Sequence, residues 1–529
     1  MDNPHVLVIG GGPAGSTTAA LLAKSGVRVT LLERDKFPRY HIGESLLASV
    51  LSTLRLSGAY DAVAAHGFQI KRGGHFQWQN DDWLLDWSKL VDAEAWSWQV
   101  QRDVFDDILL RNAAEQGAKV IEHATVTNVL FEGDRPTTVE WTVEGDDQVH
   151  TVEIDFLVDA SGRAGVLAKK QLVERQQHPA FRNVAVWSYW EGAHLHPDSP
   201  EGAINVVSTP EGGWFWNIPL SNGRHSVGYV VSARKAAPKL REQGREAYYL
   251  DTIRDSAPMS KLLAGARQVA EVKAEQDYSY SSDRFCGPGW VVVGDAACFL
   301  DPLLSSGVHL ATYSGLVASA AIASILRGEL SEADALGFYE HAYRRAYTRF
   351  LVLVSRMYEQ YVGSEEYFAH AGTLTTGHSG DTKQAQFTEI MAGLTDMDES
   401  SGAQQRAATE TIVSAAERLH DESANLEYMG HLDMSVVWDH WRDPLADTTT
   451  GELRITTDPV LGLTDRPRTD TEIAAVACPV LPPMAAGATT HKRRFGSDFS
   501  CHPPHGETAR LYIDHPWNFV CFPQVVVCR

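Results

Sequence analysis

The chain opens with a pattern of hydrophobic residues that switches between strand-like and helix-like segments. Residues 6–9, Val-Leu-Val-Ile, form a short continuous apolar run, which is typical of a buried parallel strand. Residues 16–25 are rich in alanine and leucine and predict a helix, and the apolar, β-branched run over residues 27–32 predicts a second strand. This order of elements predicts a βαβ unit and therefore an α/β fold.

A glycine-rich loop, GGGPAG over residues 10–15, joins the first strand to the helix. In a dinucleotide-binding fingerprint of this form, Gly10 makes the tight turn and Gly12 lets the backbone approach a pyrophosphate, while Gly15 lets the helix pack closely on the strand. Glu33 ends the second strand, where a carboxylate accepts the hydroxyls of an adenosine ribose. The alternative is a glycine-rich turn without a ligand, and the complete βαβ context disfavours it.

Later segments change in character along the chain. Residues 291–297, VVVGDAA, predict a strand that ends in a Gly-Asp pair and opens a helix. From residue 331 the sequence reads mainly as helix. After residue 454 the composition shifts to Pro, Gly, Thr and His with weak periodicity, which predicts a poorly ordered tail.

The charge balance narrows the classes of partner. Lys plus Arg number 46 and Asp plus Glu number 68, which gives a net charge of −22 at pH 7. This balance disfavours nucleic acid and anionic membranes as partners. Because no signal-peptide pattern precedes the first strand and no long uncharged apolar run occurs, we expect a cytoplasmic protein without a membrane span. The cysteines after residue 477 fit no compact zinc template, so no metal site is predicted.

Three further features carry chemistry. Residues 214–219 read WFWNIP, a strand pattern whose two tryptophans would ordinarily pack a core. Residues 299–307 read FLDPLLSSG and directly follow the Gly-Asp pair, and Lys71 lies between the glycine loop and the tryptophans. Taken in this order, the motifs resemble the flavin-dependent halogenases, and the resemblance fades after about residue 358.

The resemblance implies an α/β fold with a Rossmann-like FAD-binding domain of the p-hydroxybenzoate hydroxylase-like, GR2-type superfamily. A mixed β-sheet would form the substrate side, and the C-terminal region would be helical. The expected domains are a discontinuous FAD-binding domain over residues 1–70, 100–175 and 285–330, a β-sheet domain over 71–99 and 180–284, a helical region over 331–453 and the tail over 454–529.

The resemblance and the fingerprint together assign residues to FAD. Asp295 would bond the ribityl chain, and a helix N-terminus would face the flavin. Arg102 matches the superfamily arginine that lies along FAD, although an arginine at a helix start is often only surface charge. The residues expected to bind FAD are Gly10, Gly12, Ala14, Gly15, Glu33, Arg39, Arg102 and Asp295.

The resemblance also implies how halogenation is separated from hydroxylation. A hydroxylase lets its substrate touch the flavin C4a-hydroperoxide, whereas Trp214 and Trp216 would shield the flavin and leave room for halide. Backbone N–H groups of the following turn would cradle the anion, and Ser306 and Gly307 match the positions that hold it. Halide would then attack the hydroperoxide, and the resulting hypohalous acid would travel inside the protein to the catalytic Lys71.

Lys71 is the catalytic candidate in the segment GFQIKRGG over residues 67–74. Its ammonium would hydrogen-bond the oxidant, or its free amine would become a haloamine. Both roles require a buried lysine, whose pKa falls on desolvation. The neighbouring Arg72 and a merely solvated charge are the alternatives, and the context favours Lys71.

One position bears on the substrate. Tryptophan halogenases carry a glutamate where this chain has Leu304, which cannot take a proton. A phenol needs less help, because it becomes electron-rich once its own proton leaves. The pattern RYHIGESLL over residues 39–47 looks most like the phenol-type halogenases, including those acting on fungal aromatic polyketides. We therefore expect an electron-rich phenol, either free and polyketide-like or bound to a carrier protein, with no general base identified.

The expected cofactor is FAD, used as FADH2 with O2 and with chloride or bromide. Because no second dinucleotide fingerprint is found, a separate NAD(P)H-dependent flavin reductase is the implied partner. One alternative is a single-component FAD-dependent aromatic hydroxylase, which would oxidise NADPH without help. Another is a flavoprotein that has lost catalysis and serves as a binding module, and the intact Lys71 and tryptophan pair argue against it.

Overall fold

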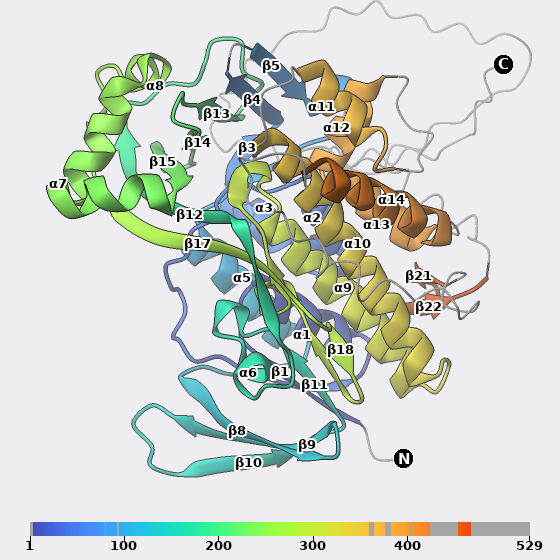
Figure 1. Cartoon of the computed structure of the whole chain (residues 1–529). Helices are drawn as coiled ribbons and strands as arrows, with labels where there is room; N and C mark the ends of the chain where they lie inside the picture. Colours follow the sequence, from blue (N-terminus) through green and yellow to red (C-terminus); the bar gives the residue numbers. More distant parts are fainter. Residues whose placement is uncertain are drawn as a thin grey trace, which may run out of the picture. The chain divides into compact units, whose positions relative to one another are not determined.

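The computed structural model describes residues 4–79, 81–92, 95–358, 364–375, 382–402, 405–423 and 453–466. The chain divides into two compact units, Met1–Pro483 and Met484–Arg529. The second unit lies wholly outside the described residues, as do the C-terminal cysteines and the tail after residue 466. The fold described below is that of the first unit (Figure 1).

A six-stranded sheet carries the glycine-rich fingerprint. Its strand order is β18-β19-β11-β1-β2-β7, and all neighbours are parallel except β18 and β19. Val8 is in register with Leu31 on one side and with Val158 on the other. The predicted βαβ unit is confirmed, because helix α1 joins β1 to β2. The bounds are β1 His5–Ile9, α1 Pro13–Lys24, β2 Arg28–Leu32, β7 Lys119–Ile121, β11 Phe156–Asp159, β18 Cys286–Gly287 and β19 Trp290–Val292.

A nine-stranded mixed sheet forms the second layer of the site. Its order is β20-β17-β12-β15-β14-β13-β4-β5, and β16 pairs with β12. Only β4 and β13 are parallel. The bounds are β4 Gly73–Trp78, β5 Asp81–Asp86, β12 Arg175–Glu191, β13 Ile204–Ser208, β14 Trp214–Pro219, β15 Arg224–Ser232, β16 Arg267–Gln268, β17 Lys273–Ser282 and β20 Cys298–Phe299.

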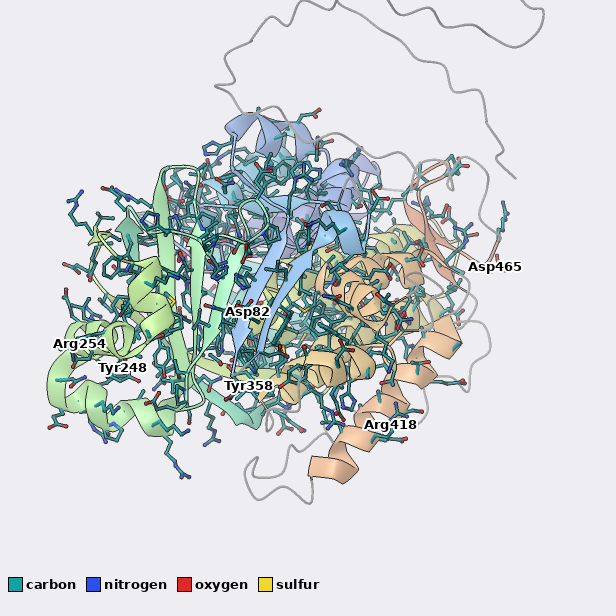
Figure 2. All side chains as sticks on the ribbon, turned by 90° about the horizontal axis from the view of Figure 1, so that it is seen from above. Asp82, Tyr248, Arg254, Tyr358, Arg418 and Asp465 are labelled. Atoms are coloured by element: carbon teal, nitrogen blue, oxygen red, sulfur yellow. The ribbon has the colours of Figure 1, made fainter. Side chains whose placement is uncertain are left out.

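Two helices cover one face of this sheet, where the sequence predicts mainly strands. They are α7, Ala233–Asp255, which is interrupted at Gly244, and α8, Ala257–Leu262. The strand-rich segment forms the predicted mixed sheet, but it also contains these two helices: Tyr248 and Tyr249 of α7 are buried against the sheet, while much of the helix surface faces solvent (Figure 2). Strand residues whose side chains point toward α7, such as Phe215, complete this apolar layer.

Smaller elements connect these sheets. Strands β8, β9 and β10 form an antiparallel three-stranded sheet, and β3 pairs with β6 so that Lys71 lies opposite Ser97. The bounds are β3 Gln69–Lys71, β6 Ser97–Gln99, β8 Ala124–Glu132, β9 Arg135–Val143 and β10 Val149–Glu153. The helices are α2 Val50–Ser57, α3 Tyr60–His66, α4 Trp87–Leu90, α5 Arg102–Glu115, the 3₁₀ turn η1 Gly162–Ala164 and α6 Val166–Lys169.

The segment after the Gly-Asp pair differs from the prediction of an immediate helix. A 3₁₀ turn, η2 Gly294–Ala296, is followed by β20 and a second turn, η3 Pro302–Leu304, and the long helix α9 begins only at Gly307 and ends at Leu326. Gly294 and Ser305 both have positive φ, 58° and 57°, which breaks a right-handed helix at each point. The helix N-terminus is thereby moved from Asp295 to Gly307.

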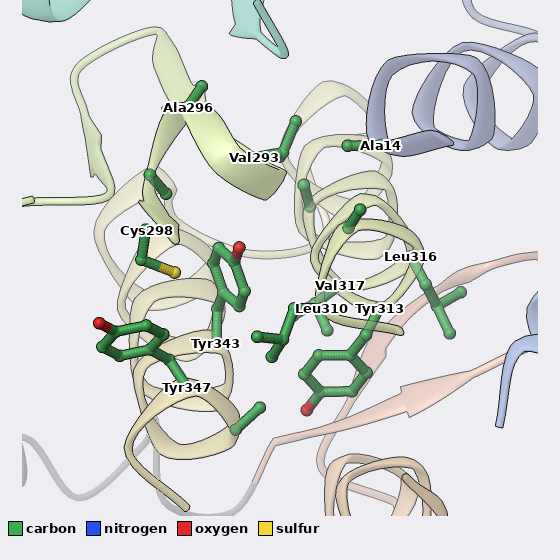
Figure 3. Packing of buried hydrophobic residues seen from close by; sticks show 14 of the residues in the cluster. Ala14, Val293, Ala296, Cys298, Leu310, Tyr313, Leu316, Val317, Tyr343 and Tyr347 are labelled. Atoms are coloured by element: carbon green, nitrogen blue, oxygen red, sulfur yellow. The ribbon is translucent and has the colours of Figure 1, made fainter. Parts of the chain in front are cut away.

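Helix α9 forms the core between α1 and the long helix α10, Glu332–Tyr358. In Figure 3, Ala14 of α1 lies on one side of α9, which carries Leu310, Tyr313 and Val317, and Tyr343 of α10 lies on the other side. Among the described residues, α9 is the one helix long and apolar enough to cross a membrane. However, 94% of its most apolar 18-residue stretch is buried inside the protein.

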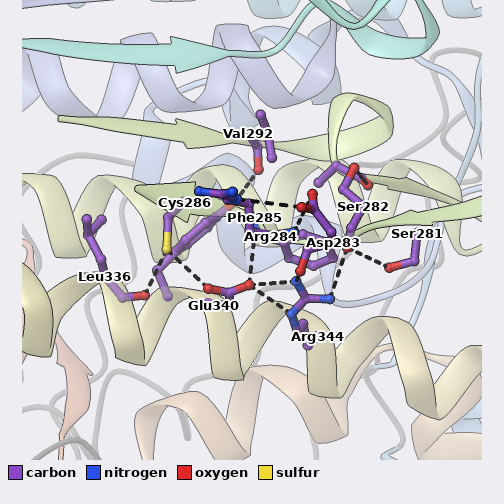
Figure 4. Close-up of polar contacts among 12 residues, drawn as sticks. Ser281, Ser282, Asp283, Arg284, Phe285, Cys286, Val292, Leu336, Glu340 and Arg344 are labelled. Carbon is purple, nitrogen blue, oxygen red and sulfur yellow. Dashed lines mark hydrogen bonds and ion pairs between the residues drawn. The ribbon is translucent and has the colours of Figure 1, made fainter. Parts of the chain in front are cut away.

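A polar cluster fixes α10 to the segment before the Gly294-Asp295 pair. Glu340 accepts from both Arg344 Nη2 at 2.6 Å and the backbone N–H of Phe285 at 3.1 Å (Figure 4). Arg344 in turn donates to the carbonyl oxygens of Ser282 and Asp283. These bonds satisfy buried backbone groups between β17 and β18 and set the position of the strand that leads to Gly294.

The C-terminal region is helical as expected, but its boundary differs. The helices are α11 Ser364–Ala371, α12 Lys383–Met391, α13 Leu394–Ser401 and α14 Gln405–Ser423. Residues 453–466 do not start a poorly ordered tail: β21, Arg454–Thr456, and β22, Gly462–Thr464, form a hairpin. The Leu463 N–H donates to Ser324 Oγ of α9 at 2.9 Å, so side-chain packing on α9 orders a segment whose periodicity is weak.

We expect the substitution Arg349→Met to lower the free energy of unfolding by about 3–5 kcal/mol. The Arg349 side chain is fully buried and forms ion pairs with Asp396 and Glu399 of α13. Among the described residues, its loss leaves the buried Asp396 hydrogen-bonded only to the neutral His309, and Glu399 in an ion pair with Arg345 alone. Chemical denaturation of both variants measures the effect, with Arg418→Met on the exposed side of α14 as the control. A loss below about 1 kcal/mol would show that these ion pairs do not hold α13 in place.

Candidate active site

One large cavity lies between the two main sheets. Its volume is about 620 Å³, and it is lined by parts of the chain that are far apart in sequence. The sequence-predicted residues that line it are Gly10, Gly12, Ala14, Glu33, Arg39, Arg102, Trp214, Trp216, Asp295 and Gly307. The structure thus brings together most of the predicted site. Gly15, Ser306 and Lys71 do not line this cavity.

The glycines of the fingerprint have different physical roles. Gly10 has φ of 105°, and a Cβ there would lie 2.3 Å from the Ala160 carbonyl oxygen. A Cβ on Gly15 would lie 1.9 Å from the Gly10 carbonyl oxygen, so Gly15 permits helix–strand packing and is not a cavity residue. A Cβ on Gly12 would meet only Arg39 Nη2 within 4 Å, at 3.5 Å. Gly12 is therefore the position where a side chain would enter the cavity.

Glu33 is held at the end of β2 by backbone donors. Its Oε2 accepts from the Gly11 N–H at 2.5 Å, and its Oε1 accepts from the Asp35 N–H at 2.8 Å. These bonds fix the carboxylate at the mouth of the glycine loop, and Glu33 also lines the cavity. The placement agrees with a ribose contact, which stays a prediction.

Two arginines give the cavity positive charge. Arg102, at the start of α5, donates to both carboxylate oxygens of Asp106 at 2.7 and 3.0 Å and is almost fully buried. Arg39 reaches the same carboxylate at 3.3 Å. The surface-charge alternative for Arg102 is therefore excluded. Burial raises the pKa of Asp295 to about 6, and the charge of Arg102 counteracts this rise.

The cavity fits FAD on several observations of the chain itself. The open face of Gly12 leaves space for a pyrophosphate, and the N-termini of α1 and α9 both supply partial positive charge at the lining. Arg39 and Arg102 add full charges, and Glu33 lies at the end of β2 where a ribose is held in such folds. When bound, reduced FAD brings two electrons and reactivity toward oxygen to this cavity.

The two indoles of β14 form one wall of the cavity. Their ring centroids are 6.0 Å apart, and the intervening Phe215 faces the opposite side of the sheet. Trp214 Nε1 donates to Tyr358 Oη at 2.6 Å, and Trp216 Nε1 donates to Ser226 Oγ at 3.1 Å. Both indoles are therefore fixed in orientation. The interpretation of the pair as pure core packing is wrong, because both rings line the cavity.

Tyr358 links the tryptophan wall to the turn before α9. Its hydroxyl donates to Asp301 Oδ2 at 2.9 Å, and Asp301 Oδ1 accepts from the Leu303 N–H at 3.0 Å. Burial raises the pKa of Asp301 to about 6. One carboxyl group thus fixes both the turn and, through Tyr358, the indole of Trp214. The sequence assigned no role to either residue.

The predicted halide cradle is only partly reproduced. Gly307 lines the cavity at the first residue of α9, and a Cβ there would meet nothing within 4 Å. Ser306 is buried, and its hydroxyl has no partner among the described residues, whereas its neighbour Ser305 is the serine of this turn that lines the cavity. The α9 N-terminus remains suited to an anion. The halide roles of Ser306 and Gly307 stay predictions.

Lys71 ends β3 and is buried, with 2% of its surface exposed. Its Nζ donates to Ser45 Oγ at 2.8 Å and to the Leu46 carbonyl oxygen at 2.9 Å, and it lies 4.8 Å from the centroid of the Trp87 ring. Ser45 lines the cavity, so one hydroxyl stands between the ammonium and the cavity. Burial lowers the pKa of Lys71 to about 7. By contrast, Arg72 pairs with Glu201 near the surface.

Glu44 lines the cavity, and no function was predicted for it from the sequence. It is 3% exposed, and burial raises its pKa to about 7. Its Oε1 accepts from Tyr189 Oη at 2.8 Å, whereas its Oε2 has no hydrogen-bond partner among the described residues. The signal available in the sequence was a carboxylate between Gly43 and Ser45, directly before the apolar pair Leu46 and Leu47.

One group of potential metal ligands occurs among the described residues, away from the cavity lining. Ligand atoms of His75, Asp82 and His196 lie within 4.8 Å of one another. His75 Nε2 is hydrogen-bonded to Asp82 Oδ1 at 2.5 Å and its Nδ1 to Ser199 Oγ at 3.1 Å, so both ring nitrogens already have partners. The absence of a metal site remains a prediction.

The cavity thus combines the glycine-rich dinucleotide fingerprint with two indoles of fixed orientation, and a buried lysine lies one hydroxyl beyond its lining. The family model for tryptophan halogenases matches residues 5–94 and 85–426. The chain belongs to this family of flavin-dependent halogenases. The class inferred from the motifs is thereby confirmed, and the hydroxylase alternative is not favoured.

Individual relatives agree with this assignment. A tryptophan 2-halogenase of Chondromyces crocatus is 41% identical over 426 residues, covering 79% of this chain and 80% of that protein. The sulochrin halogenase of Aspergillus terreus is 38% identical over 381 residues, covering 67% and 69%. The solved structure of the myxobacterial chondrochloren halogenase CndH has a TM-score of 0.63 at 35% identity, covering 78% and 97%.

The family fixes the reagents of the reaction. The enzyme uses FAD as FADH2, with O2 and halide. Halogenases of this family generally receive reduced flavin from a separate reductase and act on a small substrate. The solved relatives include the flavin-dependent brominase Bmp2, with a TM-score of 0.68 at 25% identity.

Proposed function

We propose that this enzyme oxidises chloride or bromide in the flavin cavity and halogenates an electron-rich phenol at Lys71. The observation that carries the proposal is the position of Lys71. It is fully buried and outside the cavity lining, yet its ammonium donates to Ser45, which does line the cavity. A hypohalous acid formed in the cavity therefore has only Ser45 between itself and the Lys71 ammonium.

The residues that serve halide oxidation line the cavity, and those that serve halogen transfer lie at Lys71. Reduced FAD, when bound, would supply two electrons to oxygen. The oxygen activated in this way would oxidise the halide. Trp214 and Trp216 occupy the wall of the cavity and deny an organic molecule close approach, because hydrogen bonds to Tyr358 and Ser226 keep their rings from turning away. The N-terminus of α9 at Gly307 holds the halide by its N–H groups. Glu33, Arg39, Arg102 and Asp295 hold the nucleotide and ribityl parts of FAD.

Lys71 positions the oxidant for transfer of halogen to carbon. A pKa of about 7 leaves both ammonium and free amine populated near neutral pH. The ammonium can donate a hydrogen bond to hypohalous oxygen, and the amine can accept halogen. Desolvation makes both forms accessible, which a solvent-exposed lysine would not allow.

The proposal of a phenolic substrate is based on one side chain in the turn before α9. Leu304 is 1% exposed and offers no carboxylate to stabilise the cationic intermediate of a weakly nucleophilic indole. A phenolate supplies its own electron density. One relative is named a sulochrin halogenase and another a tryptophan 2-halogenase, so tryptophan is the competing substrate. The proposal includes a cytoplasmic location, the discontinuous FAD-binding domain described above, and a phenol that is free rather than bound to a carrier.

The test supplies purified enzyme with FAD, a flavin reductase, NADH, and chloride or bromide. Free phenols, carrier-bound phenols and tryptophan are offered in parallel, and mass spectrometry reads the halogen isotope pattern. We expect a monohalogenated free phenol and no product when halide is omitted. Halogenated tryptophan alone would overturn the substrate class. A hydroxylated product formed with NADPH and no reductase would overturn halogenation itself.

A further inference from the structure

Halide oxidation requires a proton inside the cavity. The balanced reaction is FADH2 + O2 + Cl⁻ + H⁺ → FAD + HOCl + H2O, in which oxygen gains four electrons, two from the flavin and two from chloride. Halogenation of the phenol by HOCl then releases water and no net proton. One proton from solvent must therefore reach the cavity in every turnover, and this requirement rests on the proposed function.

Glu44 is placed to hold such a proton. Glu44 lines the cavity, and its Oε2 is a buried oxygen without a hydrogen-bond partner among the described residues. The groups that face it are Tyr189 of β12, Ser226 of β15, and Arg102 and Asp103 of α5. Its desolvation raises the pKa to about 7, while Tyr189, Ser226 and Arg102 limit that rise. Near neutral pH the group can therefore both release and regain a proton.

A continuous set of hydrogen bonds leads from Glu44 to the surface. Tyr189 Oη donates to Glu44 Oε1 at 2.8 Å, and Tyr40 Oη lies 3.1 Å from Tyr189 Oη. Trp187 Nε1 donates to Tyr40 Oη at 2.8 Å, which leaves the Tyr40 proton to point toward Tyr189. Tyr40 is 45% exposed and also lines the cavity mouth.

The two phenols are suited to pass a proton without ionising. Burial raises the pKa of both Tyr40 and Tyr189 above the ordinary value, so each stays neutral. A proton that arrives at the Tyr40 oxygen releases the Tyr40 proton to Tyr189, and Tyr189 releases its proton to Glu44. Each oxygen forms one O–H bond as it breaks another, and no charge remains on either ring.

We infer that Glu44 is the proton donor for halide oxidation, and that Tyr40 and Tyr189 form the relay that reloads it from solvent. Arg102 and Asp103 change the proton affinity of this donor through their charges, and Ser226, whose hydroxyl accepts from the indole of Trp216, also lowers it.

The first test needs neither flavin nor turnover. Infrared spectroscopy of the FAD-free protein should show a carboxylic-acid band that disappears with a midpoint near pH 7 and is absent from Glu44→Gln. Because the Tyr189 hydroxyl stabilises the ionised carboxylate, Tyr189→Phe should move this midpoint to higher pH. A wild-type midpoint near the ordinary value of 4.5 would overturn the inference.

The second test follows single turnovers of enzyme loaded with FADH2, after mixing with oxygen, bromide and a phenol that the wild type brominates. We expect Glu44→Gln to slow bromination about 100-fold and Tyr189→Phe about 10-fold, with the FAD Kd within about threefold of wild type. Tyr249→Phe is the matched control, since it removes a buried hydroxyl that bonds Trp190 and Val227 behind the sheet. Its rate should equal that of the wild type.

The other possible results also decide whether Glu44 is the proton donor. A Glu44→Gln rate above half the wild-type rate would overturn the donor role and leave the halogenase proposal intact. Loss of FAD from Glu44→Gln would assign Glu44 to cofactor binding instead and equally overturn it. If no phenol is halogenated by the wild type, the proposed function fails, whereas the infrared result still reports on Glu44 itself.

Discussion

Replacing Lys71 by alanine is expected to reduce halogenated product by about 1,000-fold or more, while FAD still binds and reduced flavin still consumes oxygen. The reason is spatial. Lys71 lies beyond Ser45 and does not line the cavity, so its removal affects the step after hypohalous acid has formed. Product is measured by mass spectrometry, oxygen uptake by electrode, and FAD content by absorbance.

The adjacent position supplies the control. Arg72→Ala removes a charge that pairs with Glu201 near the surface, and the variant should retain near-normal halogenation. Lys71→Met keeps the length and apolar stem of the side chain and should be as inactive as Lys71→Ala. If Lys71→Ala halogenates at a near-normal rate, the assignment of Lys71 is wrong.

The second large effect is expected from Gly12→Val, which should raise the FAD Kd by about 100-fold or more and yield a colourless protein. The new side chain would occupy the open space in front of the loop, where a pyrophosphate approaches the backbone. Absorbance of the purified variant and fluorescence titration with FAD measure the loss. A normal flavin spectrum would refute the placement of the pyrophosphate.

Neighbouring glycines separate binding from folding. Gly12→Ala adds one methyl group whose nearest contact is Arg39 Nη2 at 3.5 Å, so a smaller loss of affinity is expected. Gly10→Val and Gly15→Val place a Cβ against backbone oxygen and should lower the yield of folded protein as well. Circular dichroism of all four variants distinguishes the two effects.

Local sequence patterns predicted the parts of the site that depend on neighbours in the chain. The apolar run before Gly10 and the return to strand before Glu33 fix a βαβ unit by themselves, because each element buries its own side chains. The alternation in β14 predicted two aromatics on one face. The pattern does not reveal whether the tryptophan face of β14 points toward the cavity or toward α7. That orientation depends on pairing with strands distant in the sequence, and only the structure shows it.

Other features depend on contacts that no local pattern contains. The Tyr189 hydroxyl reaches Glu44 across 145 positions, and Tyr358 reaches Trp214 across 144. The hairpin over residues 454–464 has little periodicity of its own and is ordered by α9. The sequence pattern predicts a helix directly after the Gly-Asp pair, whereas α9 starts at Gly307. The positive φ of Gly294, which a sequence does not reveal, breaks the helix at that point.

The central claim is that the oxidant forms at the flavin and acts at a separate lysine. A crystal structure of the enzyme with FAD bound tests it most directly through the distance from Lys71 Nζ to the nearest isoalloxazine atom. We predict about 10 Å, roughly two strand spacings, with Trp214 and Trp216 beside the flavin and Ser45 between the flavin and the ammonium. Lys71 in contact with the isoalloxazine, or turned into solvent on the far face, would contradict the account.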